Sequence, residues 1–352
     1  MPIWLKGNEV SLEKKIIEKV VTSLRFRTQP LASLYKAAIV GPTRRKHGAL
    51  SRRLEYPFFF LSPQKKKEIF VSRPSALGDV LLCTPALREF KQQNPNIKIH
   101  FFTHYEDLVR GLPYIDSVSP YDQRPWDSIE FSYENSIPPI RHIAKIFGDQ
   151  LNINVANTVP DCIVPQKETD EIYSKFAALP RPWFVVSRKA GPWTPNKDWP
   201  DSHWDELVSR LLKLGSVFEV GNSSMLTELA GFNYVNLTGC TNVLEMVALI
   251  AMSNIYLGPI SGPVHIASAT KVPSVVIYGG YELASCSGYP MNINLTNELN
   301  CAPCWLRTPC PIDKKCLSEI SSDRVFDAVL TILGRKKTDL PVNSWAFSYA
   351  PT

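Results

Sequence analysis

The sequence lacks any apolar run of the roughly 18 residues that a helix needs to cross a bilayer. The longest candidate, residues 244–257, is interrupted by Glu245, Ser253 and Asn254. The first residues also lack the charged segment, apolar segment and small-residue cleavage site of a secretion signal. These absences argue against a membrane-spanning or secreted protein, and we expect a cytoplasmic one.

Recognition motifs for nucleic acid are also missing, and excess basic charge is confined to one end of the chain. Residues 1–67 contain fifteen Lys or Arg against four Glu, a local charge of +11. The whole chain has a formal charge of +6, so the remaining residues carry −5. A neutral-to-acidic body of this kind argues against a nucleic-acid partner.

The basic extension, residues 1–67, contains one amphipathic helical pattern. Its apolar residues recur at helical spacing: Leu12, Ile16, Ile17, Val20, Val21 and Leu24. A basic stretch with interleaved apolar residues can rest on an anionic membrane surface, here the inner face of the membrane. It can equally be a helix packed on the body with a solvated basic loop. Both interpretations stay open.

A disulfide framework is disfavoured, because eight cysteines occur without a secretion signal. Four of them cluster, at Cys301, Cys304, Cys310 and Cys316. Four thiolates within sixteen residues could bind a structural zinc or iron ion. The second pair lacks the CxxC spacing of the first, so reduced, packed thiols remain the alternative.

The 352 residues exceed the usual size of one domain, and from residue 68 strands and helices alternate. In the first half we predict strands at 69–71, 97–102 and 117–118 and helices at 79–92, 105–111 and 142–148. In the second half we predict strands at 183–187, 217–220, 255–257 and 274–278 and helices at 202–214, 243–252 and 264–270, with Asp201 as N-cap.

This succession predicts an α/β protein with two Rossmann-like, doubly wound domains facing a central cleft, preceded by the basic extension. We place the first domain at residues 68–175, the second at 176–334 and a tail at 335–352. The linker is expected near residues 165–182.

The first candidate site is the turn between the first strand and the first helix, with Ser75, Gly78 and Asp79. Ligands bind where parallel strands end, and Gly78 permits a tight turn and a close approach. Asp79 could act as a general base on an attacking hydroxyl or could simply cap the helix.

The second candidate site is the loop that precedes residues 264–270. Amide groups at a helix start bind phosphate, so Ser261, Gly262, Pro263, Val264 and His265 form a candidate diphosphate cradle. The alternatives are a plain turn and, for His265, a hydrogen-bonded core residue.

Two further residues are assigned to the same ligand. Lys197 could neutralise the diphosphate as a point charge, or be a surface lysine. Gly221, which ends the strand at 217–220, is placed on the donor side as well.

These sites, in this order, resemble glycosyltransferase family 9, the ADP-heptose:lipopolysaccharide heptosyltransferases. The matching stretches are residues 73–87, 113–116, 196–200, 202–204, 261–267 and 273–279, and the similarity covers residues 68–334. The resemblance implies a GT-B fold and an inverting displacement with Asp79 as base. Lys197 and residues 261–265 would hold the diphosphate of a nucleotide-sugar, with ADP-sugar favoured, and no cofactor would be required for catalysis.

One position departs from the family pattern. Family members carry Asp before the Ser/Thr-Gly of the second loop, whereas this chain has Ile260, which cannot accept a hydrogen bond from a sugar hydroxyl. The donor can therefore be heptose or a related sugar. Glu134 and His142 are placed on the acceptor side, with a solvated carboxylate and a helix-surface histidine as the alternatives.

The sequence thus predicts an inverting glycosyltransferase that moves a sugar to a lipopolysaccharide-type, lipid-linked or other glycan acceptor. Two rivals stay open: a nucleotide-sugar hydrolase or epimerase on the same fold, and a non-catalytic nucleotide-sugar-binding scaffold.

Overall fold

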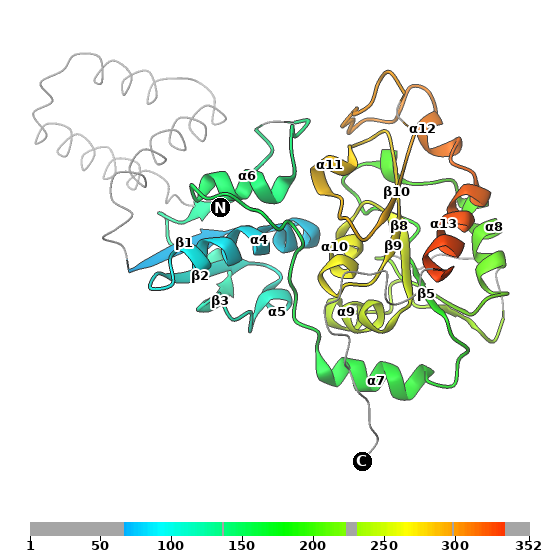
Figure 1. Cartoon of the computed structure of the whole chain (residues 1–352), viewed down its shortest axis with the longest axis horizontal. Coiled ribbons are helices and arrows are strands. Elements are labelled where there is room, and N and C mark those ends of the chain that lie inside the picture. Colours follow the sequence, from blue (N-terminus) through cyan, green and yellow to red (C-terminus); the bar gives the residue numbers. More distant parts are fainter. Residues whose placement is uncertain (1–66, 136, 223–230, 298, 335–352) are drawn as a thin grey trace, which may run out of the picture. The chain divides into compact units, whose positions relative to one another are not determined.

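The computed structural model describes residues 67–135, 137–222, 231–297 and 299–334 (Figure 1). The predicted amphipathic helix and membrane contact in residues 1–66, and the tail from residue 335, lie outside the described residues. Both sheets described below belong to one unit, which begins at Lys67.

The first sheet is parallel, with the strand order β3-β2-β1-β4. Its strands are β1 (Glu68–Ser72), β2 (Lys98–Thr103), β3 (Ser117–Pro120) and β4 (Ile129–Glu130). Its helices are α4 (Leu77–Gln93), α5 (Glu106–Val109) and α6 (Ile143–Gln150), with a 3₁₀ turn η2 (Tyr121–Gln123). Strands β2 and β4 flank β1 on opposite sides. The order in which successive strands join the sheet therefore reverses between β1 and β4.

The second sheet is parallel as well, with the order β10-β9-β8-β5-β6-β7. Its strands are β5 (Trp183–Val186), β6 (Ser216–Glu219), β7 (Tyr234–Asn236), β8 (Ile255–Pro259), β9 (Ser274–Gly279) and β10 (Ile293–Thr296). Read from β5, this is the 3-2-1-4-5-6 order of a dinucleotide-binding sheet, and its reversal lies between β5 and β8.

Helices cover both faces of the second sheet (Figure 1). They are α8 (Asp201–Leu211), α9 (Val243–Met252), α10 (Gly262–Ala269), α11 (Ala284–Ser287), α12 (Lys315–Ser318) and α13 (Ser322–Gly334), with a 3₁₀ turn η3 (Pro195–Lys197). Helices α8 and α13 contact each other on one face, and α9 and α10 contact each other on the opposite one.

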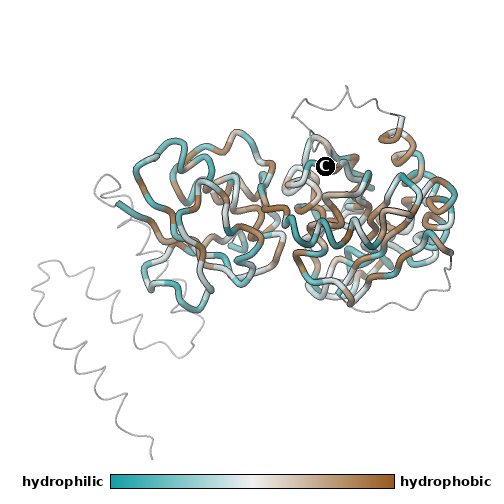
Figure 2. Tube along the Cα trace, turned by 90° about the horizontal axis from the view of Figure 1, so that it is seen from below, coloured by the Kyte–Doolittle hydropathy of each residue, from teal (hydrophilic) through white to brown (hydrophobic). Residues whose placement is uncertain are grey.

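The cores follow the strand pattern. All four residues of β5 are buried, as expected for a parallel strand covered on both faces. Helix α8 adds Trp204 and Leu207 to the same core, where Trp199 packs edge-on against Trp204. Figure 2 shows hydrophobic stretches running through the interior and hydrophilic ones at the surface.

The predicted α/β class with two doubly wound parallel sheets is confirmed. Most predicted strands and helices fall within one or two residues of those observed, and the helix at 243–252 has the predicted bounds. Asp201 is not the N-cap of α8, because Pro200 occupies that position. The Asp201 carboxylate instead forms an ion pair with Lys189.

The segment expected as a linker contains a helix, α7 (Gln166–Phe176), which contacts α9. Its prolines lie at or beyond the ends, and Pro165 is its N-cap. Only Ile172 and Phe176 are buried, so the apolar pattern was too sparse to predict it. In the described part of the chain, no helix is long and apolar enough to cross a membrane.

Candidate functional site

The first candidate site lies at the reversal point of the first sheet. The chain leaving β1 supplies Arg73 and Asp79, and the chain leaving β4 supplies Tyr133 and Glu134. Both strands end at the same edge because they are parallel. Residues more than fifty positions apart therefore meet where doubly wound folds bind ligands.

Asp79 lies in the first turn of α4 and is held from three sides. Arg73 Nη2 donates to its Oδ2 in a very short ion pair, and the amide of Ala76 donates to the same oxygen over 3.3 Å. The Tyr133 hydroxyl lies 3.4 Å from Oδ1. The capping role is therefore confirmed, whereas the role of Asp79 as a general base stays a prediction.

Arg73 bridges the two carboxylates. Its side chain is 7% exposed and also bonds Glu134 Oε1 at 2.6 Å and Oε2 at 3.2 Å. Burial raises the pKa of Asp79, while the Arg73 charge opposes that rise. Burial alone would raise the pKa of Glu134 too, but hydrogen bonds and charge from Arg73 lower it to about 2. The cluster thus holds two carboxylates around one cation.

The second candidate site lies at the reversal point of the second sheet, after β5 and β8. Lys197, at the end of η3, is only 15% exposed, which corrects the surface-lysine alternative. Its Nζ bonds Glu282 Oε2 at 2.8 Å and lies 4.7 Å from the ring centroid of Tyr281. Glu282 is 3% exposed and also accepts a short bond from Ser287 Oγ. Lys197 is therefore a largely buried cation paired with a buried carboxylate, and its contact with a diphosphate stays a prediction.

The start of α10 offers fewer free amides than the sequence suggests. Ser261 is the N-cap, but its hydroxyl donates to Pro259 O instead of capping the helix. Pro263 has no amide hydrogen, and the Val264 amide donates to Ser261 O. The Gly262 amide, at the first helical position, has no acceptor within the helix and is the remaining candidate donor to an anion. The Ile260 side chain beside it is buried.

Gly78 and His265 connect the two sites. A Cβ on Gly78 would lie 2.6 Å from His265 Cδ2 and 3.3 Å from Gly262 Cα. Glycine is thus required because α4 and α10 meet here, while its predicted role in admitting a substrate stays a prediction. His265 is 5% exposed, bonds Tyr289 through Nδ1 at 2.6 Å, and has its pKa lowered by burial to about 3. It is a neutral, hydrogen-bonded histidine at the junction.

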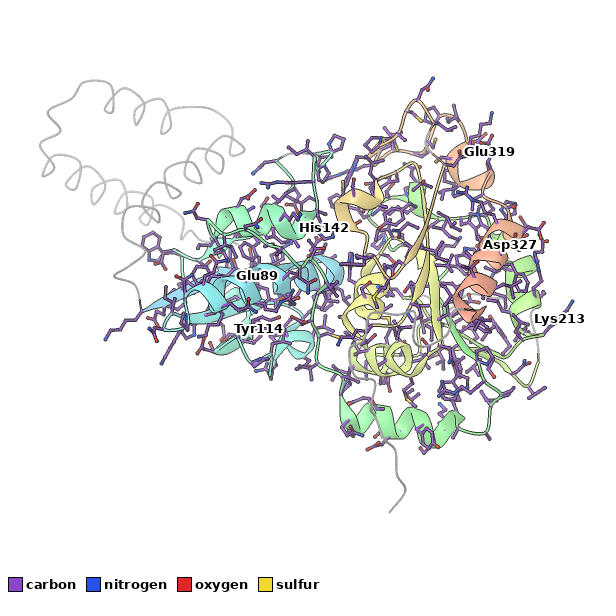
Figure 3. All side chains as sticks on the ribbon, in the orientation of Figure 1. Glu89, Tyr114, His142, Lys213, Glu319 and Asp327 are labelled. Atoms are coloured by element: carbon purple, nitrogen blue, oxygen red, sulfur yellow. The ribbon has the colours of Figure 1, made fainter. Side chains whose placement is uncertain are left out.

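His142 is not a helix-surface residue. It is the N-cap of α6, where its Nδ1 accepts from the Ala144 amide, and it is 7% exposed (Figure 3). Burial lowers its pKa to about 4. Glu134 is likewise not a solvated carboxylate, since it pairs with Arg73. Ser75 is exposed beside the α4 turn, and Gly221 follows β6, where its carbonyl accepts from the Gly239 amide.

The four clustered cysteines are free thiols, and Cys301 is exposed. Burial raises the pKa of Cys316, and charge repulsion from the three other thiols raises it as well. However, among the described residues no three His, Cys, Asp or Glu side chains lie close enough together to hold a metal ion. The arrangement of these thiols therefore does not fit the predicted zinc or iron site.

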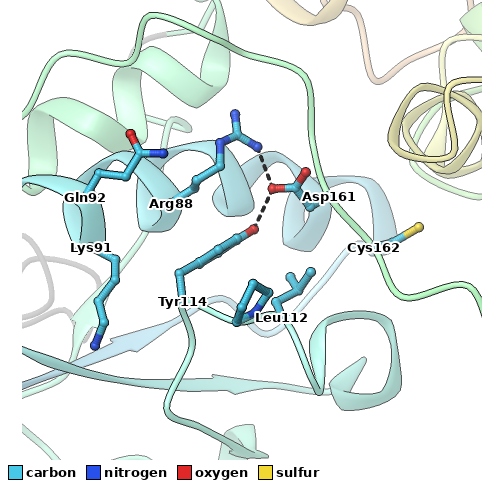
Figure 4. Close-up of a pocket in the computed structure, with 8 residues that line it drawn as sticks. Arg88, Lys91, Gln92, Leu112, Tyr114, Asp161 and Cys162 are labelled. Carbon is cyan, nitrogen blue, oxygen red and sulfur yellow. Dashed lines mark hydrogen bonds and ion pairs between the residues drawn. The ribbon is translucent and has the colours of Figure 1, made fainter. Parts of the chain in front are cut away.

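A pocket of about 520 Å³ lies elsewhere on the first half of the protein (Figure 4). It is lined by Arg88, Lys91 and Tyr114 among others, and Arg88 lies about 14 Å along α4 from Asp79. Arg88 and Tyr114 both bond Asp161, and Lys91 pairs with Asp116. The cations that line the pocket are paired with carboxylates. We therefore interpret the pocket as part of the packing of residues 157–162 against α4 and not as a ligand site.

Sequence reasoning assigned no role to Arg73, Tyr133, Glu282 or Trp305. Arg73 directly follows β1 within the first motif, so its position at a strand end could have marked it as a candidate site residue. The ring of Trp305 lies 6.3 Å from that of Tyr133 and 6.0 Å from Lys197 Nζ, centroid distances that join segments far apart in the chain. No local pattern reveals such contacts.

Residues 126–315 match the family model described as glycosyltransferase family 9 (heptosyltransferase). This region contains Lys197, the α10 start and three of the four clustered cysteines, but it begins after Asp79 and ends before Cys316. Lipooligosaccharide heptosyltransferase 2 of Campylobacter jejuni subsp. jejuni serotype O:6 is 28% identical over 97 residues. The match spans 27% of this chain and 30% of that relative, so most of the relative's length is unmatched.

Solved structures share the fold over a greater length. A family 9 glycosyltransferase from Veillonella parvula aligns with a TM-score of 0.60 and 18% identity, over 76% of this chain and 97% of its own. The E. coli ADP-heptose lipopolysaccharide heptosyltransferase II aligns with 0.57 and 17%, over 76% and 98%. The iron-containing dodecameric glycosyltransferase TibC from enterotoxigenic E. coli gives 0.61 and 18%, over 79% and 81%.

The two sheets match the GT-B fold of these structures. Because the family model covers more than half of the residues, the chain belongs to glycosyltransferase family 9.

Proposed function

We propose that the protein transfers a sugar from a nucleotide-diphosphate sugar to a hydroxyl of a glycan or lipid-linked acceptor, with inversion at the anomeric carbon. The proposal rests on the two points at which the strand order reverses, one in each sheet. One presents a carboxylate, Asp79, and the other presents a cation, Lys197. Tyr133 and Trp305 contact each other between them.

In this proposal Asp79 takes the proton of the acceptor hydroxyl as that oxygen attacks the anomeric carbon. Burial raises the pKa of Asp79, and the Arg73 charge opposes that rise and so favours the ionised form that a base requires. Arg73 also engages Oδ2, which leaves Oδ1, beside the Tyr133 hydroxyl, to receive the proton. In this proposal one carboxylate oxygen of Asp79 is oriented by Arg73 and the other takes the proton.

Lys197 and the Gly262 amide would stabilise the diphosphate as the bond to the sugar breaks. A preorganised cation and a helix start can do this without a metal ion, and no step of the proposal requires a cofactor. The diphosphate would compete with Glu282 for Lys197, because that ammonium is now paired with a buried carboxylate.

We favour an ADP-sugar as donor and a lipopolysaccharide-type acceptor, because relatives bear heptosyltransferase names and one structure of TibC is described as a complex with ADP-D-β-D-heptose. Ile260 leaves heptose or a related sugar as the transferred group. Such acceptors are assembled at membranes, so we place the protein in the cytoplasm, peripheral to the inner face.

A donor screen tests the proposed function. The protein is mixed with ADP-, UDP-, GDP- and dTDP-sugars, and thermal unfolding is followed. A ligand at about 100 times its dissociation constant stabilises the folded state by about 2.7 kcal/mol. The stabilising donor is then incubated with acceptor glycans, and the product anomer is determined by NMR. We expect glycoside of inverted configuration.

Other products would favour the rivals. Free sugar or an epimer formed without acceptor would indicate a hydrolase or epimerase. Binding without turnover under all acceptor conditions would indicate a scaffold. Absence of binding to every donor would refute the proposal itself.

Replacing Lys197 with methionine should lower kcat by about 10²- to 10³-fold, the usual cost of losing one group that stabilises developing charge. It should also destabilise the fold by about 3–5 kcal/mol, because Glu282 is left buried without its cation. Steady-state kinetics and thermal unfolding measure the two effects.

A double variant, Lys197→Met with Glu282→Gln, separates them. Removing the orphaned charge should restore most of the stability, while activity stays low because the cation is still missing. Recovery of activity along with stability would show that Lys197 has only a structural role.

A further inference from the structure

The segment that carries the cysteines is fixed beside the second site by hydrogen bonds on two sides. The Cys304 and Trp305 amides donate to the carbonyls of Gly280 and Tyr281, each over 3.2 Å. On its other side, Thr194 Oγ1 and Asn196 Nδ2 donate to Leu306 O at 2.8 and 2.9 Å. The backbone around residue 305 is therefore held firmly next to η3 and the end of β9.

Trp305 itself adopts a backbone conformation that is costly for a bulky side chain. Its φ is 48°, in the left-handed region that favours glycine. Residues persist in this region when their surroundings impose it, and such positions cluster where ligands bind. The contacts of residues 304–306 impose it here, and they turn the indole ring toward Tyr281 and Tyr133.

The ring of Trp305 lies among three groups of the proposed reaction. It packs against Tyr281 with a centroid distance of 5.3 Å and meets Tyr133 edge-on at 6.3 Å. Tyr133 is the residue whose hydroxyl faces Asp79, and Lys197 Nζ lies 6.0 Å from the Trp305 centroid. Trp305 thus lies between Asp79, the proposed base, and Lys197, the cation proposed to bind the diphosphate.

The indole N–H of Trp305 has no hydrogen-bond partner among the described residues, although the side chain is only 9% exposed. Buried donors nearly always have a partner. Trp204 shares this property, but it lies in the hydrophobic core against Trp199. At Trp305 the neighbours are a lysine, two tyrosines and, through Tyr133, a carboxylate.

We propose that Trp305 is the contact for the transferred sugar of the donor. This inference rests on the proposed function, because a sugar in transfer must lie between the base and the diphosphate cation. The indole N–H would donate to a sugar oxygen, and the indole ring would contact the apolar C–H face of the sugar. Trp305 would thereby supply recognition that Ile260 cannot.

Two substitutions separate the contributions of the ring and the N–H. Trp305→Phe keeps an aromatic surface and removes the donor, whereas Trp305→Leu removes both. Trp126→Leu is the matched control, because that indole is 89% exposed. Titration calorimetry with ADP and with ADP-heptose gives, for each protein, the dissociation constant for ADP divided by that for ADP-heptose. This ratio isolates the contribution of the sugar.

We expect Trp305→Phe to reduce the ratio by about three- to ten-fold, as for one lost hydrogen bond. Trp305→Leu should reduce it further, by about ten-fold or more, because apolar contact is lost as well. The affinity for ADP alone should stay within about two-fold of the original, and Trp126→Leu should change neither constant. Circular dichroism and the Tm establish that each variant is folded, and Trp305→Phe alone suffices if the leucine variant does not fold.

The outcomes distinguish this inference from the function on which it rests. If the unaltered protein binds ADP-heptose more tightly than ADP but the variants keep the same ratio, Trp305 does not contact the sugar. Equal losses for ADP and ADP-heptose would also overturn the inference, since they indicate a structural role. If the unaltered protein binds no nucleotide-sugar and transfers none, the proposed function fails and this inference fails with it.

Discussion

An Asp79→Asn variant should lose about 10²- to 10⁴-fold in kcat, the usual contribution of a positioned general base. Asparagine retains an oxygen for Arg73 and the Ala76 amide, so the local structure should persist. What it loses is the ability to take a proton. Nucleotide affinity should therefore be unchanged, because Lys197 and the α10 start are not altered. Initial rates at saturating donor, together with calorimetric titration of the nucleotide, measure both quantities.

Asp323→Asn provides a matched control for this experiment. Asp323 also lies in the first turn of a helix, α13, and pairs with an arginine, Arg210, at 2.6 Å. Its replacement removes a comparable charge without touching the site, so kcat should be unchanged. If Asp79→Asn retained activity within a factor of about three of the unaltered protein, another residue would have to be the base.

The fold was largely predictable because its signals are local. Apolar runs such as that of β5 and glycine-containing turns such as that at Gly78 occur at the points where strands give way to helices. Helices α7, α11, α12 and α13 and strands β4, β7 and β10 were not predicted. In α7 only two buried residues mark the inner face, and β10 is a four-residue edge strand that has one fully buried side chain, Leu295. Such elements are selected by packing on neighbours, which a local pattern does not contain.

The candidate site was predictable in its positions but not in its partners. Asp79 and Lys197 were singled out because each follows a strand of a doubly wound sheet. Arg73 lies in the same turn as Asp79, but Glu134 and Glu282 come from other parts of the chain. The placement of Glu134 on the acceptor side remains a prediction, but the structure adds a second role as the carboxylate that shares Arg73.

An Arg73→Met variant should be destabilised by about 3–5 kcal/mol at pH 8, because one buried cation neutralises both carboxylates of the cluster. In the unaltered protein the folded-state pKa of Glu134, about 2, lies below its ordinary value of 4.5. The stability from that group is therefore present above pH 4.5 and lost as pH falls toward 2. Without Arg73, hydrogen bonds from Ser132 Oγ and the Tyr133 amide still favour ionised Glu134. Asp79, however, loses the charge that opposes the burial-driven rise of its pKa, so stability from Asp79 is lost as pH rises. The deficit of the variant should accordingly be smaller at pH 5 than at pH 8, as measured by urea denaturation at both values.

A second substitution tests whether this deficit arises from unpaired charge. Adding Glu134→Gln to Arg73→Met removes one of the two orphaned carboxylates, so part of the stability at pH 8 should return and the pH dependence should weaken. Asp79, whose pKa burial raises in the intact cluster, would then carry the remaining dependence. A deficit of the same size at pH 5 and pH 8, unaffected by Glu134→Gln, would mean that Arg73 acts through its packing on Tyr133, whose ring lies 5.4 Å from the guanidinium carbon. In that case the ionised form of Asp79 would need another group to favour it, and the assignment of Asp79 as the base would lose the support of Arg73.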